Sequence, residues 1–75
     1  MDSEFLAIAV VKPNHGREND VLELLNTFYA LLARKGYSRD ILYRSHKDAT
    51  RFFNLRYWKS EETRTEAHED PEVHR

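Results

Sequence analysis

The sequence predicts one small α+β domain that works as a dimer. Its 75 residues allow one domain at most, and a chain of this size buries only about 60% of its unfolded surface, so a partner would help its stability. Three short segments have the composition of strands, and two others carry the signals of helices. The first strand is apolar on both sides, which is typical of a strand that is covered on both sides. We therefore expect a second layer that one chain does not supply.

The first strand is expected at Phe5–Val11, a run that is too short for a core helix and rich in strand formers. Because side chains alternate along a strand, its two faces differ. The bulky face suits packing against helices and consists of Leu6, Ile8 and Val10. The other face, which is also apolar but has small residues in its middle, consists of Phe5, Ala7, Ala9 and Val11.

A helix is predicted from about Arg17 to Lys35, and Gly36 stands where a left-handed C-terminal cap belongs. Its acidic residues come early and its basic residues late, as the helix dipole favours. The apolar positions recur at helical spacing and form one broad stripe that we expect to be core: Val21, Leu24, Leu25, Phe28, Leu31 and Leu32, widened by Leu22, Tyr29 and Ala33.

A hairpin and a second helix follow. Strands are expected at 37–45 and 50–58, and the turn between them is short enough for a hairpin. Ser60 can cap the next helix, and Asp70-Pro71 ends it. The predicted order of elements is therefore β-α-β-β-α.

The third strand carries the most informative face. Two aromatic rings, an amide and a cation occupy every second position and therefore point to the same side of the strand: Phe52, Asn54, Arg56 and Trp58. If the small-residue face of the first strand lies beside them, the two strands form a cavity with apolar walls and a few polar groups that orient a ligand. The alternative is a solvent-facing strand side with some aromatic cover.

The composition excludes several kinds of chemistry. Without cysteine there is no disulfide, no thiol catalysis and no thiolate metal site. The four histidines have no metal-ligand spacing with a supporting carboxylate, so we expect no metal. No glycine-rich phosphate loop and no nucleophile elbow is present.

The charge and the start of the chain bear on its partners. Twelve basic residues against thirteen acidic ones give no field that would attract nucleic acid or an acidic membrane. RNA-recognition domains share the element order, but 50–58 lacks the glycines of their signature. The start is acidic and its apolar run is short, so we expect neither a secretory signal nor a membrane span, and a cytoplasmic location.

Several short motifs follow one another along the chain: Val11-Lys12-Pro13 before the first helix, Gly36 before the second strand, Leu42-Tyr43-Arg44-Ser45, Arg51-Phe52 through Trp58-Lys59-Ser60-Glu61-Glu62, and Ala67-His68 with Pro71 beyond. In order and spacing they resemble the antibiotic-biosynthesis monooxygenase family, over nearly the whole of residues 1–75. The resemblance implies a single domain with a ferredoxin-like fold, whose sheets pack face to face as a dimeric α/β barrel. A homodimer is the assembly that it implies.

The family includes oxygenases that need no metal or flavin and that oxidise phenolic or quinol-type polycyclic substrates. In such members a strand asparagine and a tryptophan four residues later line the pocket, and Asn54 and Trp58 match that pair. The resemblance implies that Asn54 bonds a substrate oxygen and that the Trp58 indole donates to an oxyanion or peroxide. It also implies that His68 moves a proton. The residues expected to bind a small aromatic substrate, without a cofactor, are Phe5, Ala7, Ala9, Phe52 and Arg56.

Two features depart from the family's pattern. Haem-degrading members have a tryptophan where this chain has Ala67, so haem cleavage is not expected. The family also has a fourth strand after the second helix, and its absence before Arg75 suggests truncation at the C-terminal end. Phe5–Val11 would then be a bare edge, which a neighbouring chain covers or which drives self-association beyond a dimer. The alternative function is therefore a non-catalytic dimeric ligand-binding or stress-response module of the same fold.

Overall fold

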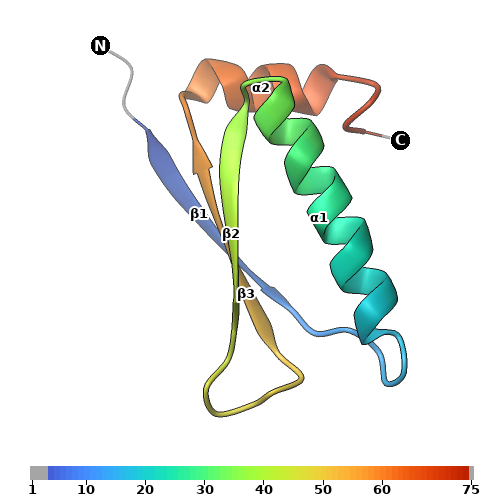
Figure 1. The fold of residues 1–75 in the computed structure, drawn as a ribbon. Helices are drawn as coiled ribbons and strands as arrows, with labels where there is room; N and C mark the ends of the chain where they lie inside the picture. Colours follow the sequence, from blue (N-terminus) through green and yellow to red (C-terminus); the bar gives the residue numbers. More distant parts are fainter. Residues whose placement is uncertain (1–3, 75) are drawn as a thin grey trace.

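The computed structural model describes residues 4–74 and has the five elements in the predicted order (Figure 1). They are β1 (Phe5–Val11), α1 (Glu18–Arg34), β2 (Ser38–Arg44), β3 (Phe52–Trp58) and α2 (Glu61–Glu69). The strands form one antiparallel sheet in the order β1-β3-β2, so β3 is central. This arrangement confirms the predicted ferredoxin-like α+β fold. Within residues 4–74, β1 pairs only with β3 and has no strand on its other side.

The helix ends follow from short local signals. Gly36 has a φ of +77°, and the amides of Gly36 and Tyr37 donate to the carbonyls of Ala33 and Leu32. These two hydrogen bonds satisfy carbonyls at the end of α1 that would otherwise lack a partner. At the start of α2, the Ser60 hydroxyl accepts from the Thr63 amide, and the Thr63 hydroxyl accepts from the Ser60 amide. Both predicted helix boundaries therefore have a physical cause in the sequence.

Both helices lie on one side of the sheet, and α2 crosses its end near the last residue of β3 (Figure 1). The covered face is that of Phe52, Asn54 and Trp58, which are all buried. The register sets Ala9 opposite Asn54 and Ala7 opposite Arg56, so the small-residue face of β1 points to the helix side. No helix among residues 4–74 is long and apolar enough to cross a bilayer.

The prediction that the bulky face of β1 packs against the helices was wrong. Leu6, Ile8 and Val10 lie on the opposite face, where they are 44%, 63% and 60% exposed. Both faces of β1 are apolar, so hydrophobicity alone gives no direction, and the pairing register with β3 decides which side each residue takes.

The expected core stripe of α1 is only partly buried. Tyr29 and Leu32 are in the core together with Phe52, Trp58 and Ala67. Leu24, which we expected to be core, is 69% exposed. The reason is the position of α1, which packs mainly against β2 at one edge of the sheet, so that part of its apolar face projects past the covered strands.

Candidate functional site

A cavity of about 170 Å³ lies between the sheet and the helices, at the end of β3. Its walls come from four parts of the chain. Phe28 and Leu32 come from α1, Arg56 and Trp58 from β3, and His68 from α2. The segment after α2 completes it with Val73 and His74.

The structure brings three of the predicted site residues to this cavity. They are Arg56, Trp58 and His68. The ring centroids of Trp58 and His68 are 6.4 Å apart, and those of His68 and His74 are 5.3 Å apart. Arg56 and Trp58 both line the cavity because residues two apart in a strand face the same way. His68 joins them because α2 crosses the end of the sheet at Trp58.

Aromatic rings surround the guanidinium of Arg56. Its central carbon lies 5.5 Å from the ring centroid of Phe28, 5.9 Å from that of Tyr29 and 5.5 Å from that of Trp58. Such positions favour a cation because a ring face carries partial negative charge. The charge of Arg56 is therefore held at the cavity wall, with its side chain only 22% exposed.

Asp40 of β2 fixes Arg56 and is the main site residue that the sequence reasoning missed. Its side chain is 0% exposed. It accepts a hydrogen bond from Arg56 Nε at 2.7 Å, from Asn54 Nδ2 at 3.1 Å and from Ser38 Oγ at 3.1 Å. A buried carboxylate is stable only when paired in this way. The signal was present in the sequence, since Asp40 is the one acidic residue of β2 and the neighbouring strand carries Arg56.

The other predicted site residues lie on the same face but do not line this cavity. Asn54 is 6% exposed and its amide is bonded to Asp40. Phe52 is buried at the far end of β3, where the guanidinium of Arg44 lies 4.7 Å from its ring centroid. The remaining three, all on β1 and partly or largely exposed, are Phe5, Ala7 and Ala9.

Tyr29 is a second residue that the sequence reasoning did not select. Its hydroxyl is buried and has no hydrogen-bond partner among residues 4–74. Burial raises the pKa of Tyr29, and the nearby negative charge of Asp40 raises it further, while Arg56 acts in the opposite direction. The phenol therefore stays protonated at neutral pH. It was read as a member of the apolar stripe of α1, and only the structure shows its polar end beside Asp40 and Arg56.

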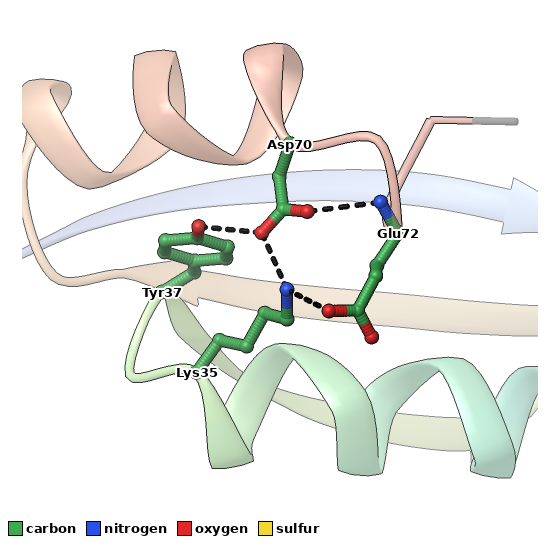
Figure 2. A network of polar contacts seen from close by, with 4 residues as sticks. All are labelled: Lys35, Tyr37, Asp70 and Glu72. Atoms are coloured by element: carbon green, nitrogen blue, oxygen red, sulfur yellow. Dashed lines mark hydrogen bonds and ion pairs between the residues drawn. The ribbon is translucent and has the colours of Figure 1, made fainter.

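A cluster of four polar residues, which we call the clasp, holds the segment after α2 in place. Figure 2 shows Lys35 at the end of α1 reaching Asp70 and Glu72, with Nζ–O distances of 2.7 and 2.8 Å. The Tyr37 hydroxyl donates to Asp70 at 2.7 Å. Hydrogen bonds from Lys35 and then from Tyr37 lower the pKa of Asp70 to about 2, and the bond to Asp70 raises the pKa of Lys35. Both groups therefore stay charged over the physiological range.

The clasp explains why His74 reaches the cavity. His68 and His74 are six residues apart, a spacing that suits neither a helix nor a strand. After Asp70 the chain turns back, with bonds from the amides of Val73 and His74 to the Asp70 carbonyl. Among residues 4–74, no three histidine or carboxylate side chains come close enough together to hold a metal ion.

An open groove of about 1020 Å³ adjoins the cavity and runs along α1. Phe28 and Val73 line both spaces. Most of its other lining residues are apolar and come from α1, among them Leu24, Leu25 and Leu31. A ligand in the small cavity can therefore extend into a larger apolar space.

Comparison with known proteins agrees with this geometry. The family model of the antibiotic biosynthesis monooxygenases matches residues 4–75. Neither the curated proteins nor the solved structures gave a significant match. Because the family match spans nearly the whole chain, and the fold is the one that the resemblance implied, the chain belongs to the antibiotic biosynthesis monooxygenase family.

Proposed function

We propose that this chain oxidises a phenolic or quinol-type aromatic substrate with molecular oxygen, and that no bound cofactor takes part. The observation that carries the proposal is the meeting of Arg56, Trp58 and His68 on one cavity that has aromatic and aliphatic walls. These side chains supply a fixed positive charge, an indole N–H and a group that can accept a proton. Membership of the family supports the reaction type.

The substrate itself is the reductant in this chemistry. An ionised phenol is electron-rich and can pass an electron to O₂ when it is desolvated and held close to it. If a methylene group conjugated with the phenol becomes a carbonyl, one oxygen atom enters the product. The other oxygen leaves as water with the two methylene hydrogens. The balance therefore needs no further reductant.

The cavity residues have separate tasks in this proposal. Arg56 favours the phenolate over the phenol, because Asp40 holds its Nε and the terminal N–H groups can donate to an anionic oxygen. Trp58 donates its N–H to the developing oxyanion or peroxide. His68 accepts the proton that the substrate loses. Phe28 and Leu32 keep water from the reacting atoms.

A non-catalytic ligand-binding module is the second candidate, and the state of Asn54 favours it. The resemblance implied that Asn54 bonds the substrate. In the structure its amide donates to Asp40 instead and lies outside the cavity wall. In this second candidate, the site binds an aromatic ligand through Arg56 and Trp58 and, without Asn54 as a second oriented donor, does not oxidise it.

We also propose that two copies pack through the face of the sheet that the helices leave open. Large apolar side chains are exposed on this face, with Leu6, Ile8, Val10 and Tyr43 all more than two-fifths exposed. An apolar surface of this kind on a small domain marks an interaction site. Sedimentation at micromolar concentration is expected to give about twice the 9.0 kDa of one chain, and a clean monomer would contradict the dimer.

Oxygen uptake with a panel of polycyclic phenols and quinols tests the oxidation. Trp58→Phe keeps the ring and removes the N–H, so turnover should fall about tenfold to a thousandfold. His68→Gln should also lower turnover, whereas His46→Gln, in the β2–β3 loop, should leave it unchanged. Binding of the panel without oxygen uptake would support the ligand-binding module. Full turnover in both Trp58→Phe and His68→Gln would remove the proposed mechanism.

A further inference from the structure

The cavity contains more hydrogen-bond donors than the protein uses. Asp40 accepts a hydrogen bond from the Nε of Arg56. The two terminal nitrogens of Arg56 donate to no atom within the described chain. The side chains of His68 and His74 likewise have no hydrogen-bond partner among residues 4–74. An imidazole carries at least one N–H in either protonation state. Donors from three side chains thus meet at a space of about 170 Å³, an arrangement that fits an anionic oxygen group.

The charge balance around Arg56 disfavours a ligand group with two negative charges. Asp40 already offsets the charge of Arg56, so the fixed charges of this pair sum to zero. A group with two negative charges would meet unfavourable repulsion from the buried Asp40 carboxylate. The two free nitrogens of Arg56 form a planar fork that matches the two oxygens of a carboxylate. A carboxylate therefore fits better than a phosphate ester.

The groove along α1 indicates the kind of molecular body that carries the carboxylate. It shares Phe28 and Val73 with the cavity, so a ligand whose acid lies at Arg56 leaves the cavity past these two side chains. From Leu24 to Arg34 the groove follows α1 for about 15 Å at the helical rise. The apolar lining of that length fits a flat or extended hydrocarbon body.

We propose that the site takes an amphipathic carboxylic acid, with its carboxylate at Arg56, His68 and His74 and its apolar body in the groove along α1. This inference depends on the proposed function only in taking the same cavity as the ligand site. It adds a class of ligand, an apolar polycyclic or long-chain acid, and it assigns His74 to binding.

Binding of anthracene carboxylate and of its carboxamide to the full chain tests the acid site. Trp58 is the only tryptophan and lines the cavity, so its fluorescence reports binding. The carboxylate should bind about tenfold more tightly than the carboxamide, and Arg56→Lys should lower this preference about tenfold. His74→Gln should lower it about threefold or more. His46→Gln is the matched control and should leave both affinities unchanged.

Leu24→Asn tests the groove with little risk to folding, since Leu24 is 69% exposed. It should weaken anthracene carboxylate about threefold to tenfold and leave the short acid benzoate unaffected. Equal affinity for carboxylate and carboxamide, or no binding of either, would overturn the acid site. So would a preference that survives in both Arg56→Lys and His74→Gln. A Leu24→Asn variant that changes the sedimentation coefficient but not the affinity would assign the groove to a protein partner and overturn its role here.

Oxygen uptake is measured separately. Acid-selective binding that follows these variants, without uptake for any substrate, would reject the oxidation and support the binding site. Oxygen uptake with neutral phenols, without preferential binding of acids, would support the oxidation and reject the acid site.

Discussion

The two faces of the sheet are built on opposite principles. The helix-covered face buries a charged and polar group in which Asp40 holds Arg56 and Asn54. The open face presents Ile8 and Tyr43, 63% and 52% exposed, to the surroundings. A small domain that maximised its own stability would bury its apolar side chains and expose its charges, because buried charge is costly and exposed apolar surface does not stabilise the fold.

The difference shows where stability and function are placed. The buried charges lie beside the cavity, so we attribute them to ligand handling. The exposed apolar side chains are remote from the cavity and on the far side of the sheet, so we attribute them to a partner. The following experiments test this assignment, in order of decreasing expected effect.

The largest effect is expected on the open face. Ile8→Lys places a charge in the proposed dimer interface at two symmetry-related positions, each losing about 2 kcal/mol, so the dimer dissociation constant should rise about a thousandfold. Leu24→Lys is the matched control, because Leu24 is similarly exposed but lies on α1. Sedimentation equilibrium measures both. Equal effects of the two variants would contradict the assignment of the open face.

Next comes the buried charge pair. Asp40→Asn leaves the guanidinium of Arg56 without its counterion, and the free energy of unfolding should fall by about 2–3 kcal/mol. Asp20→Asn is the matched control, because Asp20 forms an exposed ion pair with Arg17. It should change the free energy of unfolding by less than about 0.5 kcal/mol. Urea unfolding at one fixed protein concentration gives both values, because dimerisation makes apparent stability depend on concentration.

The double variant Asp40→Leu/Arg56→Met sharpens this test. Apolar replacement of a whole buried pair is often neutral or stabilising. The double variant should therefore regain part of the lost stability, because the buried Asn54 amide still lacks its acceptor, while losing the carboxylate preference. If stability stayed as low as in Asp40→Asn, the pair would be part of the fold and not of the site.

A smaller effect is expected at the buried hydroxyl of Tyr29. Tyr29→Phe removes a polar atom that has no partner, so the free energy of unfolding should rise by about 1 kcal/mol. Tyr43→Phe, on the exposed open face, should change it little. A loss of stability in Tyr29→Phe would mean that the hydroxyl has a partner such as an ordered water.

The clasp should show its effect mainly through pH. Asp70 has a folded pKa of about 2, below the ordinary 3.8 of an unfolded chain. Its stabilising contribution is therefore fully present above about pH 4 and is lost as the pH falls toward 2. Asp70→Asn should be less stable than the wild type at neutral pH, and the difference should vanish in that acid range. Glu69→Gln is the neighbouring control, and a pH-independent difference for Asp70→Asn would contradict the titration.

Local signals in the sequence predicted the elements well. The bounds of β1 match the structure, and those of the other elements differ by at most two residues. Ser60 and Gly36 succeed as boundary signals because a cap or a positive φ depends on neighbours in the chain. Arg56, Trp58 and His68 were placed in one site because strand alternation and the family's motifs both pointed there.

Long-range geometry was harder to predict. The covered face of β1 was assigned wrongly because both faces are apolar and only the register with β3 separates them. Asp40 was missed because its partners, Asn54 and Arg56, lie on another strand. His74 was not predicted at the site because the turn after α2, which brings it back to His68, depends on a contact with Lys35 at the end of α1.

The clasp also has a consequence for the order of folding. Its bond from Lys35 to Asp70 joins residues 35 apart in the sequence, so it forms only after that long loop has closed. The β2–β3 hairpin closes a far shorter loop and can form early. Val73 and His74 take their places at the cavity only when the clasp is made. We therefore expect the cavity wall to assemble after the β2–β3 hairpin, so that a refolding chain regains this hairpin before it can bind a ligand.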